Sequence, residues 1–170
     1  MSEEILRIAN CSGYYGDRLS AAREMVDGGP IDVLTGDYLA ELTMAILFNQ
    51  KLKRGEDKGY VGTFLKQLQD VASTCKDKNI KIVTNAGGLN PQSMTNEIRQ
   101  ILNELNIDMK VAYIEGDNLM SRIEELQKNG EEFTNIDKEI SLKDSGFPVL
   151  TANAYLCLLY TSDAADDDAC

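Results

Sequence analysis

The sequence contains no histidine. Because imidazole cannot then serve as a general base or as a metal ligand, Ser-His-Asp and Cys-His catalysis are excluded within this chain, and we expect no metal site. Cysteine is scarce as well, and no two of Cys11, Cys75, Cys157 and Cys170 stand at C-x-x-C spacing. That spacing argues against a zinc site or a disulfide framework, and it predicts a reducing, cytoplasmic location.

Long apolar runs and an excess of positive charge are also missing. The apolar runs fall far short of the roughly 18–20 residues that a membrane span needs, and the acidic start at Met1 to Glu4 is unlike a secretory signal. Acidic residues outnumber basic ones by 28 to 17, which gives a net charge of −11. The few Lys and Arg residues are scattered rather than concentrated. We therefore expect neither a membrane nor a nucleic acid as a partner.

What is present is a regular alternation of short apolar runs with stretches of helical periodicity. The runs expected to form strands are 5–9, 31–35, 80–84, 109–114 and 147–151, and the expected helices lie between them. Such alternation predicts an α/β fold, because parallel strands need helical crossovers. We expect a Rossmann-like parallel sheet of about four or five strands with helices on both faces. A partial (β/α) barrel is the alternative.

One expected helix, which runs from about Gly36 to Lys53, is apolar nearly all round between residues 39 and 48. A helix of that kind belongs in a core or at an interface. Burial of its side chains within one chain would favour the first possibility. Exposure of Met44, Leu47 and Phe48 would instead favour a homo-oligomer or a partner subunit, and with it a non-catalytic binding module.

The turns that follow the expected strands carry the candidate site. In either α/β architecture ligands bind beyond the carboxyl ends of the strands, and these turns combine glycine with polar side chains. We predict that two carboxylates, Asp37 and Glu115, face each other and move protons in place of imidazole. The predicted ligand-binding residues come from the same turns: Asn10, Ser12, Gly13, Asp17, Tyr38, Asn85, Gly87, Gly88, Asn90, Asp117 and Asn153.

The turn at 85–91 has two interpretations. Its paired glycines can expose successive N–H groups that bind a phosphate or a carboxylate, or they can simply relieve crowding between a strand and a helix. Asn90 and Pro91 predict a helix cap followed by the first helical residue. The turn matches neither a Walker loop nor a G-x-G-x-x-G motif, so no nucleotide is indicated.

The other polar residues have alternatives too. Asp17, Asp37 and Asp117 each stand near the start of an expected helix, where N-capping is the simpler explanation of an aspartate. Cys11 could be a nucleophile, but no base accompanies it, and a small half-buried thiol is the commoner role.

The last fourteen residues, 157–170, have an unusual sequence. With one choice of codons, Leu158 to Ser162 spell ctcttatacacatct and Asp163 to Asp166 continue as gacgctgccgac. That run is similar to the transposon end and adapter used to prepare DNA for sequencing. We interpret residues 157–170 as a translated adapter, to be set aside from fold reasoning, with a natural acidic tail as the alternative.

Five motifs together resemble one protein family. They are NCSGYYGD at 10–17, DYLAE at 37–41, TNAGGLNP at 84–91, EGD at 115–117 and ANAYL at 152–156. In this order they are similar to the acyclic terpene utilisation (AtuA-type) family. The family pattern continues after the last motif with Gly-Ala, whereas Cys157 follows here. Residues 1–156 therefore resemble the N-terminal portion of the family's α/β domain.

The resemblance implies a role in the breakdown of branched acyclic terpenes, whose degradation runs through acyl-CoA thioesters. It adds no catalytic residue and no cofactor, and a coenzyme A thioester is expected only as a substrate. Combined with the polar turns, it suggests hydratase or lyase chemistry on a small molecule, in which residues 85–90 hold an anionic group.

Overall fold

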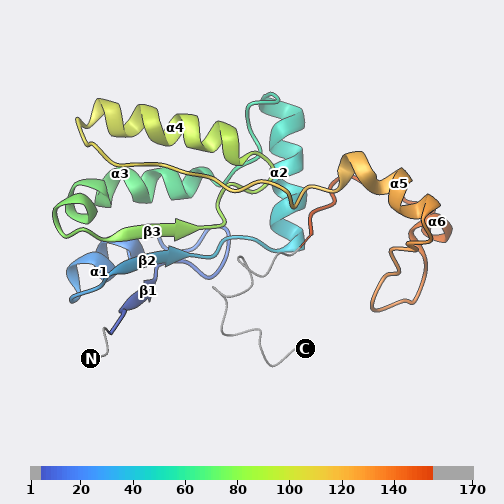
Figure 1. Ribbon diagram of the computed structural model, residues 1–170, viewed down its shortest axis with the longest axis horizontal. Coiled ribbons are helices and arrows are strands. Elements are labelled where there is room, and N and C mark those ends of the chain that lie inside the picture. Colours follow the sequence, from blue (N-terminus) through green and yellow to red (C-terminus); the bar gives the residue numbers. More distant parts are fainter. Residues whose placement is uncertain (1–4, 155–170) are drawn as a thin grey trace. The chain divides into compact units, whose positions relative to one another are not determined.

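The structure is a computed structural model that describes residues 5–154 (Figure 1). Two compact units divide these residues, 5–114 and 115–154. Within 5–154 no helix combines the length and the apolar character that crossing a membrane would require. The interpretation of residues 157–170 as a translated adapter lies outside the described residues.

The first unit alternates strands and helices as the sequence predicts, with one pair of consecutive helices. Its elements are β1 (Ile8–Asn10), α1 (Ala21–Asp27), β2 (Val33–Gly36), α2 (Glu41–Arg54), α3 (Gly62–Asp77), β3 (Lys81–Thr84) and α4 (Pro91–Glu104). The three strands are parallel and lie in the order β1-β2-β3. The prediction of an α/β fold with a parallel sheet is confirmed.

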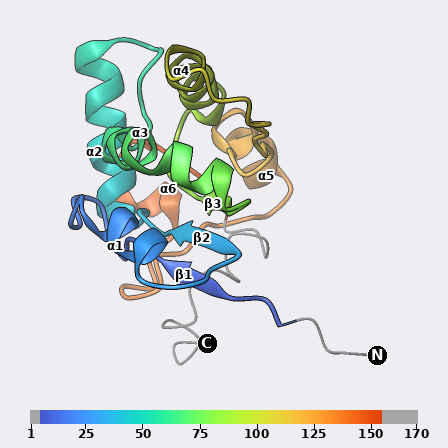
Figure 2. The same ribbon diagram turned by 90° about the vertical axis from the view of Figure 1, so that its left-hand side faces the viewer.

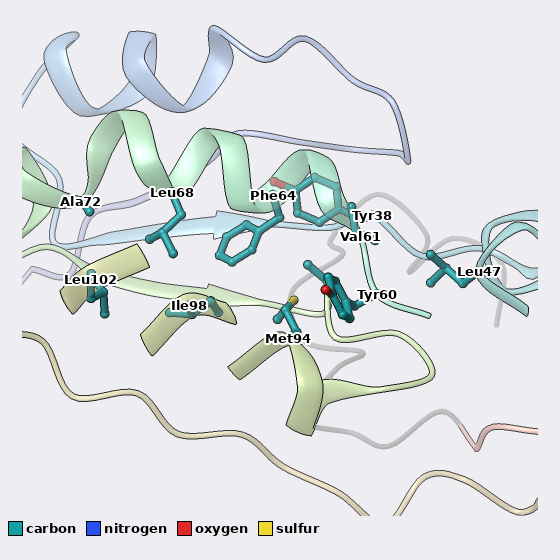
Figure 3. Packing of buried hydrophobic residues seen from close by; sticks show 11 residues of the cluster. Tyr38, Leu47, Tyr60, Val61, Phe64, Leu68, Ala72, Met94, Ile98 and Leu102 are labelled. Carbon is teal, nitrogen blue, oxygen red and sulfur yellow. The ribbon is translucent and has the colours of Figure 1, made fainter. Parts of the chain in front are cut away.

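Helix α3 lies at the centre of the core. Its residues Phe64, Leu68 and Ala72 pack against Met94 and Ile98 of α4 in one apolar cluster (Figure 3). Its next face joins a second cluster formed with α1 and Leu34 of β2. The periodicity of the sequence predicts this buried stripe, because residues three and four apart share one side of a helix.

The helices of the first unit cover one face of its sheet. Figure 2 shows the helices α1, α3 and α4 along one side of the strands. Rows of paired residues alternate between the two faces of a sheet, and Leu34 and Ile82, which occupy one row, pack in the clusters formed with these helices. The neighbouring rows hold Ile8 and Val83, whose exposed fractions are 60% and 55%. Within residues 5–114, helices therefore cover one face, where we expected both.

Two of the expected strands do not form among the described residues: 109–114 and 147–151 have no strand assignment. Met109 and Val111 instead pack their side chains against the first cluster, and Arg99 donates a hydrogen bond to the carbonyl of Val111. An apolar run becomes a strand only where another strand pairs with it, and in this run Met109 and Val111 are partly buried against the helices while Ile114 is exposed.

The second unit is built from short elements: the 3-10 turn η1 (Met120–Arg122), α5 (Ile123–Lys128) and α6 (Leu142–Ser145). An isolated antiparallel bridge joins Asn118 to Asn153. The helix expected around 119–126 is present as η1 and α5. None of residues 115–154 is fully buried. Polar contacts therefore carry much of the order of this unit.

Candidate functional site

The turns that follow β1, β2 and β3 are joined to one another by hydrogen bonds at the carboxyl edge of the sheet. The backbone N–H of Asp37 donates to the carbonyl of Ser12 over 2.9 Å, which links the first turn to the second. The backbone N–H of Tyr38 donates to Oδ1 of Asn85 over 2.9 Å, which links the second turn to the third. The structure thus brings three of the predicted site turns together at one edge, which we call the rim.

At the centre of the rim lies a carboxylate and amide pair. Nδ2 of Asn85 donates to Oδ1 of Asp37 over 2.5 Å, and the N–H of Leu39 approaches the same oxygen at 3.4 Å. Asp37 and Asn85 are both partly exposed. Asn85 uses both ends of its amide to hold the second turn, so the Asp37 carboxylate has a defined orientation. An oriented, accessible carboxylate can accept or deliver a proton.

Asp37 does not cap the following helix. Helix α2 begins at Glu41, and its capping position is Ala40, whose side chain makes no capping hydrogen bond. Of the two roles weighed for Asp37, the geometry therefore disfavours N-capping of α2. Its carboxylate instead accepts the hydrogen bond from Asn85 at the rim.

The first turn is closed by its own polar side chains. Nδ2 of Asn10 donates to the carbonyl of Ser12 over 3.0 Å, and the hydroxyl of Ser12 donates to the carbonyl of Tyr14 over 3.0 Å. The carboxylate of Asp17 accepts from the N–H of Gly13 over 3.0 Å. That hydrogen bond, with one from Arg18, holds the pKa of Asp17 below its usual value. Helix α1 begins only at Ala21, so Asp17 closes a loop rather than capping a helix.

Tyr38 and Cys11 lie beneath the rim. The Tyr38 hydroxyl donates to Oε1 of Gln67 on α3, and the Cys11 Sγ lies 3.9 Å from that hydroxyl. Both side chains are buried, and burial raises the pKa of each. The thiol therefore stays protonated, which favours the packing role of Cys11 over a nucleophilic one. At the rim itself, Tyr38 presents its backbone rather than its ring.

The glycine turn is shaped mainly by packing. A Cβ on Gly88 would collide with Leu47 of α2 and stand 2.9 Å from the carbonyl oxygen of Gly59, and the φ of Gly88 is +52°. The N–H groups of Gly88 and Asn90 donate to backbone carbonyls within the turn. Of the two interpretations, these contacts favour a tight turn over an anion site, and a ligand role for Gly87 and Gly88 stays a prediction.

Asn90 caps helix α4 as the sequence predicts. Its Oδ1 accepts the N–H of Ser93 over 3.1 Å, and Pro91 is the first residue of the helix. Its Nδ2 donates to the carbonyls of Glu56 and Lys58. The side chain of Asn90 thus ties the loop between α2 and α3 to the start of α4, and its role toward a ligand stays a prediction.

The remaining predicted site residues lie in the second unit. Nδ2 of Asn153 donates to Oδ2 of Asp117 over 2.8 Å, and the N–H of Ala154 donates to the carbonyl of Asp117 over 2.7 Å. Two motifs that are 36 residues apart in sequence are thereby brought together. Glu115 is exposed, and because it belongs to a different unit from Asp37, the pairing of these two carboxylates stays a prediction.

Neither of the two best-defined cavities of the described residues borders the rim. The larger, about 330 Å³, is a depression around Arg99, Asn103 and Asp108 near the end of α4, and the smaller, about 170 Å³, lies beside Asp57 and Glu97. Among residues 5–154 there is also no cluster of three or more acidic or cysteine side chains of the kind that could hold a metal ion.

The sequence matches one protein-family model. The model described as acyclic terpene utilisation family protein AtuA matches residues 6–169. The chain belongs to the AtuA family. All five motifs of the resemblance fall inside the matched range, which also includes 157–169. No curated protein and no solved structure matches the chain.

AtuA-family membership connects the chain with acyclic terpene utilisation. The match also covers both units, so the rim and the Asp117–Asn153 bridge lie within one family region.

Several polar residues that support the rim of this AtuA-family chain were not predicted from the sequence. Gln67 accepts the Tyr38 hydroxyl, the Thr43 hydroxyl donates to the Tyr38 carbonyl over 3.1 Å, and Gln50 donates to the Tyr15 hydroxyl over 2.9 Å. The sequence did contain a signal for Gln67, since it is a polar residue beside the apolar stripe of α3. Thr43 and Gln50 had none, because their partners lie on other elements.

Proposed function

We propose that the rim binds the polar end of a branched acyclic acid or of its coenzyme A thioester, and that Asp37 acts there as an acid–base group. The observation that carries this proposal is the Asp37–Asn85 pair, an oriented and partly exposed carboxylate at the carboxyl edge of a parallel sheet. Ligands of α/β folds bind at that edge. The family name supplies the substrate class, acyclic terpenes.

The proposed chemistry is hydration of an unsaturated thioester, or the reverse elimination. In the forward direction, Asp37 takes a proton from water as the oxygen attacks the β-carbon, and a second acid delivers a proton to the α-carbon. Glu115 is the proposed second acid, because both residues stand in family motifs and the chain contains no histidine. The turn at 85–90 is proposed to hold the thioester end.

Two isosteric variants test the carboxylates. Asp37→Asn keeps the shape of the side chain and removes its basicity, so turnover of a branched unsaturated acyl-CoA should fall by about a hundredfold or more, and Glu115→Gln should act similarly. The turnover rate is measured as the decrease in absorbance of the enoyl thioester. Asp77→Asn is the matched control, since this exposed carboxylate lies at the end of α3, outside the rim. Unchanged turnover in both test variants would show that the assignment is wrong.

A non-catalytic binding module is the second candidate, favoured by the position of the two best-defined cavities of residues 5–154, neither of which borders the rim. It predicts that the wild-type chain binds the thioester in calorimetry without converting it. Under this alternative Asp37→Asn changes the affinity, and no product forms at any pH.

A further inference from the structure

Helix α2 carries an apolar stripe that faces away from its own core. Its buried residues, Thr43 and Leu47, lie on one side, and the exposed fractions of Leu42 and Leu52 on the other side are 73% and 66%. Ala45 and Asn49 complete the stripe, since positions 42, 45, 49 and 52 follow the spacing of one helix face. The helix runs across the carboxyl end of the sheet, beside the rim (Figure 1).

The three residues named as the test of an interface are not exposed. Leu47 is fully buried, Met44 packs against the first cluster and Phe48 is partly buried, so this side of the helix belongs to the core of the unit. The opposite side keeps two leucines in solvent, although removing a leucine from water contributes about 1.5–3 kcal/mol. Single exposed leucines are common on protein surfaces, so the case for a contact surface depends also on the charges at the two ends of the helix.

The ends of α2 have opposite charges. Glu41 lies in its first turn, and Lys53 and Arg54 lie in its last turn. The ion pairs formed among residues 5–154 involve none of these three side chains. If a second α2 lies antiparallel against the stripe, each acidic end meets a basic end, and the two helix dipoles also oppose each other favourably.

The stripe is self-complementary in that arrangement. An antiparallel pair related by a two-fold axis near residue 47 sets Leu42 level with Leu52 of the other copy, Ala45 level with Asn49, and Glu41 level with Lys53. Self-complementarity of one patch is what a two-fold dimer requires. Small Ala45 lets the helices approach closely, and Asn49, whose Nδ2 donates to the carbonyl of Ala45 in its own helix, lies level with Ala45 of the other copy.

We propose that α2 is the dimer interface of this chain, and that its occupant is the α2 helix of a second copy in antiparallel orientation. Because α2 begins beside Asp37 and holds Tyr15 and Tyr38 by hydrogen bonds, pairing would also steady the loops of the rim. The inference rests on the exposed leucines and end charges, and it stands whether or not the rim is catalytic.

Sedimentation velocity of the full chain is the first test. We expect a concentration-dependent dimer that is populated at about 100 µM, a weak association that suits a small interface. Leu42→Lys and Leu52→Lys should each abolish it. Leu105→Lys, which changes an exposed leucine at the end of α4, is the matched control and should not. A monomer at every concentration, or a dimer that ignores both test substitutions, would overturn the proposal.

Charge exchange tests the antiparallel orientation. Glu41→Lys and Lys53→Glu should each weaken dimerisation by about tenfold, since each places like charges at both ends of the pair. The double variant should restore the wild-type affinity, and an equimolar mixture of the two single variants should form a heterodimer. Circular dichroism shows whether every variant is folded. A double variant as weak as the single ones would rule out the antiparallel pairing.

Discussion

Residues 5–114 and residues 115–154 reach their ordered structure by different means. The first unit buries two apolar clusters around α3, whereas the second contains no fully buried residue among those described. Both units expose some large apolar side chains, such as Leu42 at 73% in the first and Ile136 at 94% in the second, so the buried residues separate the units rather than the exposed ones. In the second unit, Asp117 accepts hydrogen bonds from Asn153 and Ala154, which join residues from its two ends.

The difference follows from the length and regularity of the apolar pattern. Helices α3 and α4 have 16 and 14 residues, which is long enough to present several apolar turns to one core. Helices α5 and α6 have 6 and 4 residues, so neither can bury a stripe. Sequence periodicity therefore organises the first unit, and hydrogen bonds between distant residues organise the second.

The largest difference between the two units in the free energy of unfolding is expected from matched leucine truncations. Leu68→Ala removes a buried side chain of α3 and should lower the free energy of unfolding by about 2–5 kcal/mol, because a cavity remains. Leu126→Ala removes a half-buried side chain of α5 and should cost about 1 kcal/mol or less. Urea unfolding followed by circular dichroism measures both. Equal costs would contradict the contrast between the units.

A second pair of variants separates crowding from backbone strain. Gly88→Ala places a methyl group against Leu47 at a positive φ, and it should cost about 2–3 kcal/mol. Gly146→Ala also has a positive φ, +68°, but meets no atom within 4 Å, so only the strain of about 1 kcal/mol remains. Thermal unfolding compares the two. If Gly146→Ala costs as much as Gly88→Ala, crowding by Leu47 is not the reason for the glycine.

Asn153→Ala tests the polar bridge of the second unit. Loss of its hydrogen bond to Asp117 should cost about 1 kcal/mol and should speed hydrogen exchange at the N–H groups of Leu119 and Ala154, which close the same bridge. Amides of β2 in the first unit should be unaffected. Asn129→Ala, at an exposed position after α5, is the control. Faster exchange in both units would mean that they unfold together.

The smallest effect concerns an exposed ion pair of the first unit. Hydrogen bonds from Arg7 lower the pKa of Asp32 from 3.8 to about 2. A carboxyl whose pKa is lowered on folding stabilises the fold above its unfolded pKa, and this contribution is lost as the pH falls toward about 2. Asp32→Asn should therefore lower the unfolding midpoint slightly at pH 6 and not at pH 2. Asp137→Asn is the control, and a pH-independent difference for Asp32→Asn would contradict the linkage.

Local chemistry made parts of this structure predictable. The start of α4 follows from Asn90 and Pro91, because a capping amide and a fixed φ act within a few residues. The buried side of α3 follows from its period. The strand predicted at 109–114 was wrong, since an apolar run says nothing about whether a partner strand lies beside it.

The rim was predictable in part. Placing Asp37 and Asn85 at strand ends needed only the alternation of strands and helices, since parallel strands end at one edge. That Asn85 orients Asp37, and that the ring of Tyr38 turns inward to Gln67, depended on contacts across 48 and 29 residues. Rules based on sequence spacing concern neighbouring residues and do not predict contacts over such separations.

The sequence by itself determined the parallel α/β character, the long helices and the family, because period, caps and motifs are written in neighbouring residues. Only the tertiary structure decided which face of the sheet the helices cover, which glycines are crowded, and which leucines of α2 remain in solvent. These features arise from side chains of distant elements meeting in space, and each depends on several elements at once.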